Sequence, residues 1–291
     1  MKKGRASNTA KVIAASTILL DSDSKTASLV APGSADLCKA FLSGSVFDRW
    51  LAKSSAWPPT RMLWRSLEGL THPGIMKHYW HRKRWIESRV QTAMACGFER
   101  LVVLGAGFDT LGFRLSAGNP KAEIVELDHP ATQGAKLRAL EDNSISIPSN
   151  LKFFGLDLGR QSFPAEIFDD SKSTLFVIEG VLMYLLPATI DRLFEVLREL
   201  PSKRLRVLFS FMTKWPDGRT EFRPHSWLVN WWLGWRNEPF AWGLEPEIMD
   251  DFLSVRGFAM KELCSTRELA EEYGLGPFNL DGENLVASEL R

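Results

Sequence analysis

Short apolar runs alternate with amphipathic stretches along most of the chain after residue 100. The runs 101–104 and 174–178 are continuously apolar and rich in β-branched residues, as expected of strands buried on both faces of a sheet. Strands are predicted at 101–104, 123–127, 151–154, 174–178, 205–211, 258–263 and 284–290, and helices at 108–115, 130–141, 187–200, 246–256 and 266–273. Repeated strand-then-helix units with short connections predict an α/β fold with a Rossmann-like, doubly wound, mostly parallel seven-stranded sheet, whose last strand pairs antiparallel at the edge.

The first hundred residues follow a different pattern. Residues 1–35 are polar and rich in Ser and Ala, which predicts either a mobile arm or a first helix. Residues 36–99 have helical patterns that are interrupted at 58–59 and 72–74, and tryptophans are spread through them, which indicates a packed helical cap. The predicted division of the chain is an arm and cap over 1–95, a core domain over 96–291, and within the core an aromatic insertion over 213–244 that covers the substrate.

The most informative stretch is 101–128, where a strand, a glycine turn, a helix and a second strand follow one another. The first strand stops at Gly105 and Gly107, and glycines let a backbone turn sharply and approach a ligand closely. The second strand ends at Asp128, 21 residues beyond Gly107, where a carboxylate would bind a pair of ribose hydroxyls. This order is typical of the first half of a nucleotide-binding βαβ unit.

The residues after the turn distinguish between nucleotides. A dinucleotide fingerprint needs a small third residue where this chain has Thr110. Asp109 stands where a pyrophosphate would lie, and a carboxylate repels phosphates but suits a cationic ligand. S-adenosylmethionine has a sulfonium, an amino-acid end and an adenosine, and it has no phosphate. The sequence therefore predicts this cofactor rather than NAD.

Two later strand ends carry further candidates. Asp157 follows the third strand, where it could accept a hydrogen bond from the adenine amine while Leu158 flanks the ring. A turn or helix-cap role for Asp157 is an equal alternative. Glu179 ends the fourth strand beside a glycine, and a buried carboxylate is costly unless a positive group pairs with it. An ammonium or sulfonium group would be such a partner.

A basic run at 78–90 precedes the core domain. Its cationic side chains are Arg82, Lys83, Arg84 and Arg89. One interpretation is a solvated helix face. The other is that one arginine points inward and binds the cofactor's carboxylate in a bidentate pair, although spacing alone does not say which.

Tryptophan is unusually frequent, with eleven in the chain and five of them between 227 and 242. Trp227, Trp231 and Trp235 are spaced four residues apart and share one face of a predicted helix. These rings either seal the insertion onto the core or line an apolar substrate pocket.

Composition excludes several classes of protein. With 36 basic and 35 acidic residues the net charge is +1, so no general nucleic-acid surface is expected. Cys38, Cys96 and Cys264 lie far apart without metal-ligand spacing, which predicts a reduced cytoplasmic protein with no metal site and no disulfide framework. The apolar segment 12–20 is too short to span a bilayer and lacks a convincing signal-peptide cleavage site, so no membrane partner is expected.

Ordered motifs give the chain a family resemblance. They are LGAGFDTLGFRL at 104–115, VELDHP at 125–130, GLDL at 155–158 and EGVLMYL at 179–185, with LCKAF at 37–41 and HYWHRKRWIE at 78–87 upstream. With these motifs the chain resembles the leucine carboxyl methyltransferase family of S-adenosylmethionine-dependent class I methyltransferases, especially its bacterial members, over about residues 36–212. Two positions depart from the usual pattern: Leu111 replaces an arginine and Glu87 an aspartate.

The resemblance implies roles for individual residues. Lys39 and Arg82 would hold the carboxylate of the cofactor's methionine end, and Glu179 would bind its amino group. The remaining implied contacts are with the methionine moiety for Gly105, the ribose for Asp128, and the adenine for Asp157 and Leu158.

The predicted activity is O-methylation of a carboxylate to a methyl ester, on a peptide, a protein C-terminus or a small acid. A carboxylate is already ionised at pH 7, so positioning and the exclusion of water would carry the reaction without a strong base. Tyr184 could donate a hydrogen bond to the acceptor or only pack in the core. Arg223, His225 and Arg236 could orient the acceptor or only lie at the surface.

Two alternatives remain open at the level of sequence. The acceptor could be a phenol or hydroxyl of a small metabolite, which would require a base such as His225 or His81. The chain could also be a non-catalytic partner-binding protein that keeps the methyltransferase fold and uses the tryptophan-rich insertion as an interface.

Overall fold

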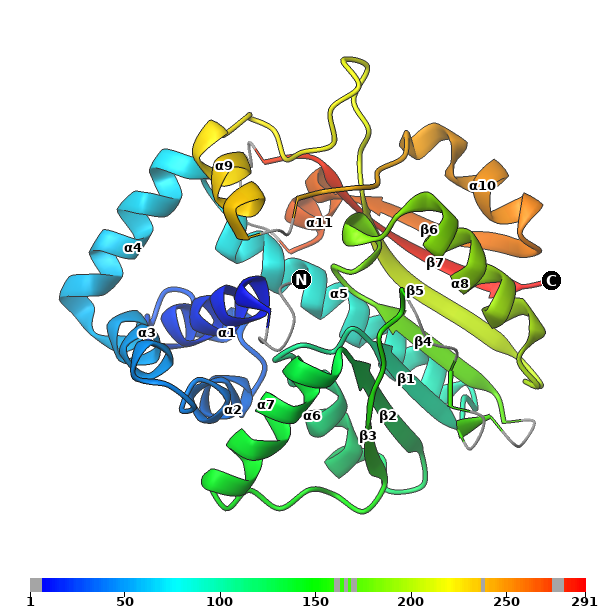
Figure 1. The fold of residues 1–291 in the computed structure, drawn as a ribbon, viewed down its shortest axis with the longest axis horizontal. Coiled ribbons are helices and arrows are strands. Elements are labelled where there is room, and N and C mark those ends of the chain that lie inside the picture. The colour runs from blue at the N-terminus through cyan, green and yellow to red at the C-terminus, as the bar shows by residue number, and fades with distance from the viewer. Residues whose placement is uncertain (1–6, 160–162, 165–166, 169–171, 237–238, 274–279) are drawn as a thin grey trace.

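The computed structural model describes residues 7–159, 163–164, 167–168, 172–236, 239–273 and 280–291. At its centre is a seven-stranded sheet in the order β3-β2-β1-β4-β5-β7-β6 (Figure 1). The strands are β1 (Arg100–Leu104), β2 (Glu123–Asp128), β3 (Leu151–Gly155), β4 (Thr174–Ile178), β5 (Leu205–Met212), β6 (Phe258–Ser265) and β7 (Glu283–Leu290). The first five strands are parallel, which confirms the predicted doubly wound, mostly parallel α/β fold.

The last strand lies inside the sheet rather than at its edge. Its predicted antiparallel pairing is confirmed, because β7 runs antiparallel to β5. The predicted edge position is wrong, because β6 pairs with the other side of β7, from Phe258 opposite Leu290 to Ser265 opposite Asn284. Since β7 has a neighbour on each side, Glu283 at its start is fully buried.

Helices cover both faces of the sheet. On one face, α8 (Pro187–Glu199) and α10 (Met249–Val255) pack against alternate strand residues such as Val102 and Phe176. On the other face, α5 (Ile75–Ala95), α6 (Leu111–Gly118) and α11 (Thr266–Glu272) pack against the intervening residues. The continuous apolar runs in the strands therefore have a core on each side.

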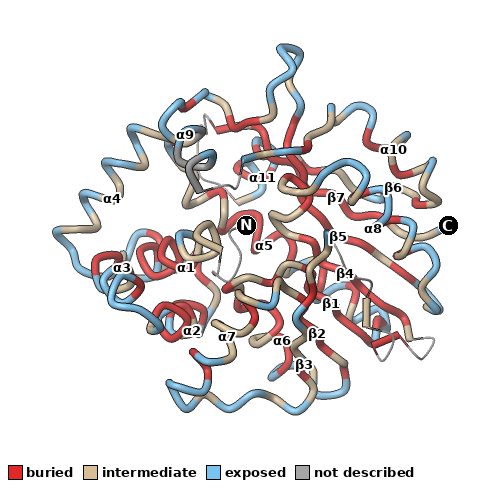
Figure 2. Tube along the Cα trace, viewed as in Figure 1, coloured by how far each residue is buried: buried red, intermediate tan, exposed pale blue. Residues whose placement is uncertain are grey.

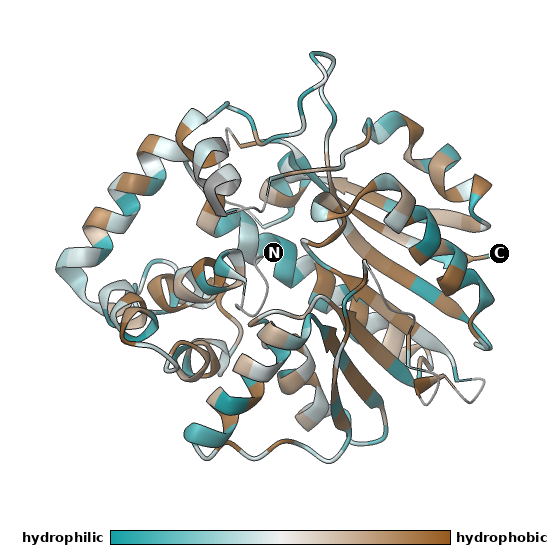
Figure 3. Cartoon of the chain, in the orientation of Figure 1, coloured by the Kyte–Doolittle hydropathy of each residue, from teal (hydrophilic) through white to brown (hydrophobic). Residues whose placement is uncertain are grey.

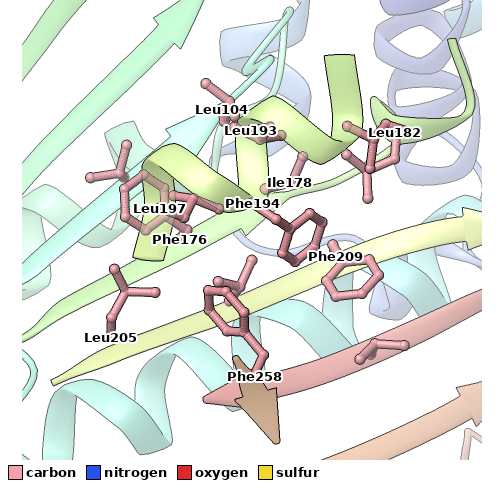
Figure 4. Packing of buried hydrophobic residues seen from close by; sticks show 14 of the residues in the cluster. Leu104, Phe176, Ile178, Leu182, Leu193, Phe194, Leu197, Leu205, Phe209 and Phe258 are labelled. Atoms are coloured by element: carbon pink, nitrogen blue, oxygen red, sulfur yellow. The ribbon is translucent and has the colours of Figure 1, made fainter. Parts of the chain in front are cut away.

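The first of these cores is rich in phenylalanine (Figure 4). Phe194 of α8 packs edge-on against Phe209 of β5 and Phe258 of β6, with ring centroids 5.8 and 5.5 Å apart. Rings in this arrangement interact favourably beyond the area that they bury. The contacts fix α8, and with it the segment that follows Glu179, against the sheet.

Over residues 7–99 the structure shows helices and no strand. The helices are α1 (Asn8–Asp21), η1 (Ala27–Leu29), α2 (Ser34–Phe41), α3 (Val46–Ala56), α4 (Pro58–Thr71) and α5. The chain breaks at Pro58 and around residues 72–74, as predicted. Of the alternatives for the first 35 residues, the first helix is confirmed, because α1 buries Ala14 and Ile18 in the cap. The prediction that the tryptophans of the cap are packed holds only in part, because Trp50 is largely exposed.

The other helical elements in the described ranges are α7 (Pro130–Asp142), η3 (Leu182–Tyr184), α9 (Trp227–Arg236) and η4 (Pro246–Ile248). Apolar residues are concentrated in the strands of the sheet (Figure 3). Within the described part of the chain, none of the helices has both the length and the apolar character needed to cross a membrane. The cytoplasmic location stays a prediction.

Candidate cofactor site

The glycine turn after β1 adopts a backbone that side chains disfavour. Gly105 has φ +71° and Gly107 has φ +52°, both in the left-handed region. A Cβ atom on Gly105 would lie 2.3 Å from Cγ2 of Val181, which is closer than any real contact. The turn can therefore pack against the segment after Glu179 only because residue 105 has no side chain.

Asp128 at the end of β2 meets this turn. Its carboxylate accepts hydrogen bonds from the backbone N–H groups of Gly107 and His129. Burial raises the pKa of Asp128, while these two donors oppose the rise. The structure thus brings together the first turn and the acid of the second strand, as the predicted ribose site requires.

Glu179 lies on the other side of the turn, between two cations of α5. Its Oε1 is 2.7 Å from Nη2 of Arg82 and 3.1 Å from Nζ of Lys83. Lys83 also binds Oδ2 of Asp109 at 2.8 Å. Gly107, Asp109 and Glu179 are therefore parts of one site, and the basic run on α5 points two side chains inward, Arg82 and Lys83.

The charges of this site are strongly coupled. Burial by itself would lower the pKa of Lys83, but Asp109 and Glu179 outweigh it and hold this pKa above its usual value. Burial by itself would raise the pKa of Asp109, but Lys83 outweighs it and holds this pKa well below its usual value. Lys83 and Asp109 are therefore ionised at neutral pH.

The cluster extends to the C-terminal strand. Nη1 of Arg82 donates to both carboxylate oxygens of Glu283, at 2.8 and 2.9 Å. His78, one turn earlier in α5, lies 2.6 Å from Oε2 of Glu283. Burial would raise the pKa of Glu283, but Arg82 and His78 lower it to about 2. Arg82 is thereby held between two carboxylates from strands at some distance along the chain.

The residues present fit S-adenosylmethionine. Asp109, Glu179 and Glu283 supply three carboxylates, which pair with Arg82, Lys83 and His78. The cofactor has a net charge of +1 from its sulfonium, ammonium and carboxylate. The acid at position 109 that disfavours a phosphate is in place, next to a glycine turn in the left-handed region.

Asp157 and Leu158 follow β3, next to β2 in the sheet. Oδ1 of Asp157 accepts from the backbone N–H of Gly159 at 3.1 Å, so this side chain shapes a turn. Leu158 lines a shallow apolar pocket with Phe163, Leu185 and Leu193. Their implied contact with adenine stays a prediction.

Lys39 is not brought to the charge cluster. Its Nζ pairs with Asp36 at 2.8 Å, one turn earlier in α2, and both side chains are exposed. The family-implied contact with the cofactor's carboxylate therefore stays a prediction, whereas Lys83 is the lysine that binds Glu179.

The three predicted catalytic residues lie around the insertion. Tyr184 packs on Phe240 with ring centroids 5.7 Å apart, and both belong to a small apolar cluster with Met183 and Phe222. Arg223 forms an ion pair with Asp217 on an exposed hairpin.

His225 has a different environment from Arg223. Its Nδ1 lies 2.7 Å from Oε2 of Glu221, a carboxylate whose side chain is only 6% exposed. His81, by contrast, is fully buried and stacks on Tyr273. The structure thus shows an oriented imidazole in the insertion that sequence spacing did not reveal.

The tryptophan stripe on α9 is not a sealed contact. Trp227 and Trp231 are 68% and 63% exposed. The side chains of Trp235 and Arg236 lie outside the described residues. Neither of the two described rings therefore seals the insertion onto the core or lines an enclosed pocket within this structure.

Sequence reasoning missed four titratable residues. Glu283 and His78 gave no local signal, because only the sheet topology brings β7 against α5. Lys136 pairs with Glu126 at 2.5 Å, both fully buried, and donates to the carbonyl of Asp109. The sequence signal for this pair would have been a charged residue inside the apolar strand β2 and one of opposite charge on the following helix α7. Within the described ranges, no group of His, Cys, Asp and Glu side chains is arranged to hold a metal ion.

A doubly wound sheet with a glycine turn, a second-strand acid and an acidic fourth-strand end is the arrangement of the class I methyltransferases. The leucine carboxyl methyltransferase family model matches residues 19–198, which is more than half of the chain. The chain therefore belongs to this family.

Relatives from mycobacteria have names that assign them provisionally to the S-adenosyl-L-methionine-dependent methyltransferases. One from Mycobacterium marinum is 30% identical over 136 residues, which are 45% of this chain and 43% of that protein. One from Mycolicibacterium gilvum is 27% identical over 216 residues, 69% of this chain and 67% of that protein. The chain thus spans about half the length of several curated relatives that it matches. Membership of this family and the names of these relatives confirm S-adenosylmethionine as the predicted cofactor.

Among solved structures, a provisionally assigned methyltransferase from Thermobifida fusca has a TM-score of 0.55 and 16% identity, covering 88% of this chain and 93% of that one. This similarity shows the shared fold.

Proposed function

We propose that the protein is an S-adenosylmethionine-dependent O-methyltransferase that converts a carboxylate into a methyl ester. The observation that carries this proposal is the buried charge cluster at the glycine turn, in which Glu179 lies between Arg82 and Lys83. Its three carboxylates suit a cationic nucleotide. Membership of the leucine carboxyl methyltransferase family supports a carboxylate as the acceptor.

The residues of the site would divide the work of binding. Arg82 and Glu179 would hold the carboxylate and ammonium of the methionine end, Asp128 the ribose, and Asp157 with Leu158 the adenine. When bound, the cofactor supplies an electrophilic methyl group on a sulfonium. Arg82 and Glu179 lie side by side as an ion pair. The cation of Arg82 would bind the cofactor's carboxylate, and the anion of Glu179 would bind its ammonium group.

A carboxylate acceptor does not require a general base from the protein, because it is already ionised at pH 7. The apolar cluster of Met183, Phe222 and Phe240 beside Tyr184 would exclude water from the acceptor side. Excluding water favours a reaction in which a carboxylate and a sulfonium neutralise each other. We infer that the acceptor is a peptide, a protein C-terminus or a small acid.

Binding and transfer are tested separately. Calorimetry with S-adenosylhomocysteine should detect binding to the wild type, about hundredfold weaker binding to Glu179→Gln, and unchanged binding to the control Glu195→Gln, an exposed residue of α8. Incubation with radiolabelled methyl donor and cell extract should then give a product that is hydrolysed by base. Binding without transfer to any extract would favour a partner-binding protein, and a base-stable product would contradict the ester.

The pair of Glu221 and His225 favours a hydroxyl acceptor as a second candidate. A buried carboxylate 2.7 Å from Nδ1 fixes the ring and leaves Nε2 to accept a proton. For such an acceptor, His225→Gln should lower kcat by about a hundredfold and remove an ionisation from the pH–rate profile. For a carboxylate acceptor, the same variant should keep kcat nearly unchanged.

A further inference from the structure

Helix α4 packs against the protein mostly with polar side chains, together with Trp64, which contacts the apolar core of the cap. Arg65 forms an ion pair with Asp23 at 2.5 Å, and Oε1 of Glu68 accepts from the backbone N–H of Met76 at 3.0 Å. None of its residues is buried (Figure 2). A helix on the surface of a globular protein normally turns its apolar stripe inward, so α4 is inverted.

The outward side of α4 is almost continuously apolar, and α3 extends it. The large apolar side chains exposed on these two helices and at their junction are Val46, Phe47, Trp50, Trp57, Met62, Leu63, Leu67 and Leu70, which we call the α3–α4 surface. They are half of the sixteen large apolar side chains that are exposed in the described part of the chain, within only 25 residues. Such a concentration indicates a binding surface, because exposed apolar residues are otherwise scattered.

The charges around this surface have one sign. Arg49 and Lys53 of α3 are exposed. The acidic residues of the two helices do not oppose them: Asp48 is buried and paired with Lys11 at 2.8 Å, and Glu68 faces α5. The cationic character is local, because the net charge of the whole chain is only +1.

Exposed tryptophan and leucine beside lysine and arginine, with acids turned away, match the interface of an anionic membrane. Aromatic and aliphatic side chains enter the boundary between headgroups and acyl chains, while cations bind anionic headgroups. An interface between proteins would instead be depleted in exposed lysine. Charge complementarity therefore favours lipid over a second copy of the chain.

We propose that the α3–α4 surface binds the headgroup region of an anionic lipid bilayer and attaches the protein peripherally. The attachment needs no spanning helix, so it is compatible with the lack of such a segment in the described residues. It stands as an alternative to the expectation of no membrane partner, and the experiment below distinguishes the two. It does not depend on the proposed methyl transfer, because no residue of the cofactor site belongs to this surface.

The test is co-sedimentation of the full chain with vesicles of phosphatidylcholine and phosphatidylglycerol in equal amounts. The double variant Leu67→Ser/Leu70→Ser should bind about tenfold more weakly or worse. Arg49→Gln/Lys53→Gln should lose about fivefold per cation and bind these vesicles little better than vesicles of phosphatidylcholine alone. The control Leu186→Ser/Val255→Ser changes two exposed apolar residues elsewhere and should bind like the wild type.

Each other outcome overturns the proposal. Wild-type protein that stays in the supernatant, or variants that sediment like the control, would exclude the α3–α4 surface as a lipid site. A wild-type dimer in analytical ultracentrifugation that Leu67→Ser/Leu70→Ser dissociates, without vesicle binding, would assign the surface to a second copy. Circular dichroism and S-adenosylhomocysteine binding of each variant show that the fold is retained.

Discussion

Replacing Glu283 by glutamine removes the charge that holds Arg82 in the core. Glu283 is fully buried, and Arg82 donates to both of its oxygens while His78 lies 2.6 Å away. A carboxyl whose pKa falls from an ordinary value of 4.5 to about 2 stabilises the folded state by roughly 3 kcal/mol when ionised. Breaking a buried ion pair from one side costs about the same, ~3–5 kcal/mol, which supports this magnitude.

The sign of the pH dependence follows from the lowered pKa. The stabilisation is complete above the unfolded-state value and is lost as the pH falls from about 4.5 toward 2. The free energy of unfolding of Glu283→Gln, measured by urea titration, should therefore lie roughly 3 kcal/mol below that of the wild type at pH 7. The difference should shrink steadily as the titrations are repeated at lower pH.

Glu289 on the same strand provides the control. Its carboxylate is partly exposed and lies 3.7 and 3.6 Å from Arg204 and Arg206. Glu289→Gln should cost less than about 1 kcal/mol, because exposed ion pairs contribute little. Equal losses in the two variants, or a difference that does not change with pH, would refute the reasoning about Glu283.

Two further predictions address the turn and the thiols. Gly105→Ala should abolish S-adenosylhomocysteine binding in calorimetry, because the added methyl group overlaps Val181. The control Gly118→Ala has open space around the added methyl group and should bind normally. Equal binding by the two variants would show that the turn can relax. Burial raises the pKa of the Cys38 thiol to about 12, whereas Cys96 is exposed. Iodoacetamide at pH 8, followed by mass spectrometry, should therefore label Cys96 first. Labelling of Cys38 at the same rate would contradict its burial.

The sequence by itself determined the parallel strands of the core and the residues at their ends. Apolar runs, glycines at 105 and 107, and the acids at 128 and 179 are local signals, because strand burial and a left-handed turn each constrain residue type at neighbouring positions. The helix breaks at Pro58 and near residue 73 were predictable for the same reason.

Only the tertiary structure decided which charges meet. Glu283 reaches Arg82 across 201 positions of sequence because β7 is inserted between β5 and β6, and no local pattern specifies that insertion. The direction of α4 was also beyond the sequence, since periodicity shows that a helix has an apolar side but not which side faces the protein. Periodicity is a property of one segment, whereas ion pairing and exposure depend on what the rest of the chain places beside it.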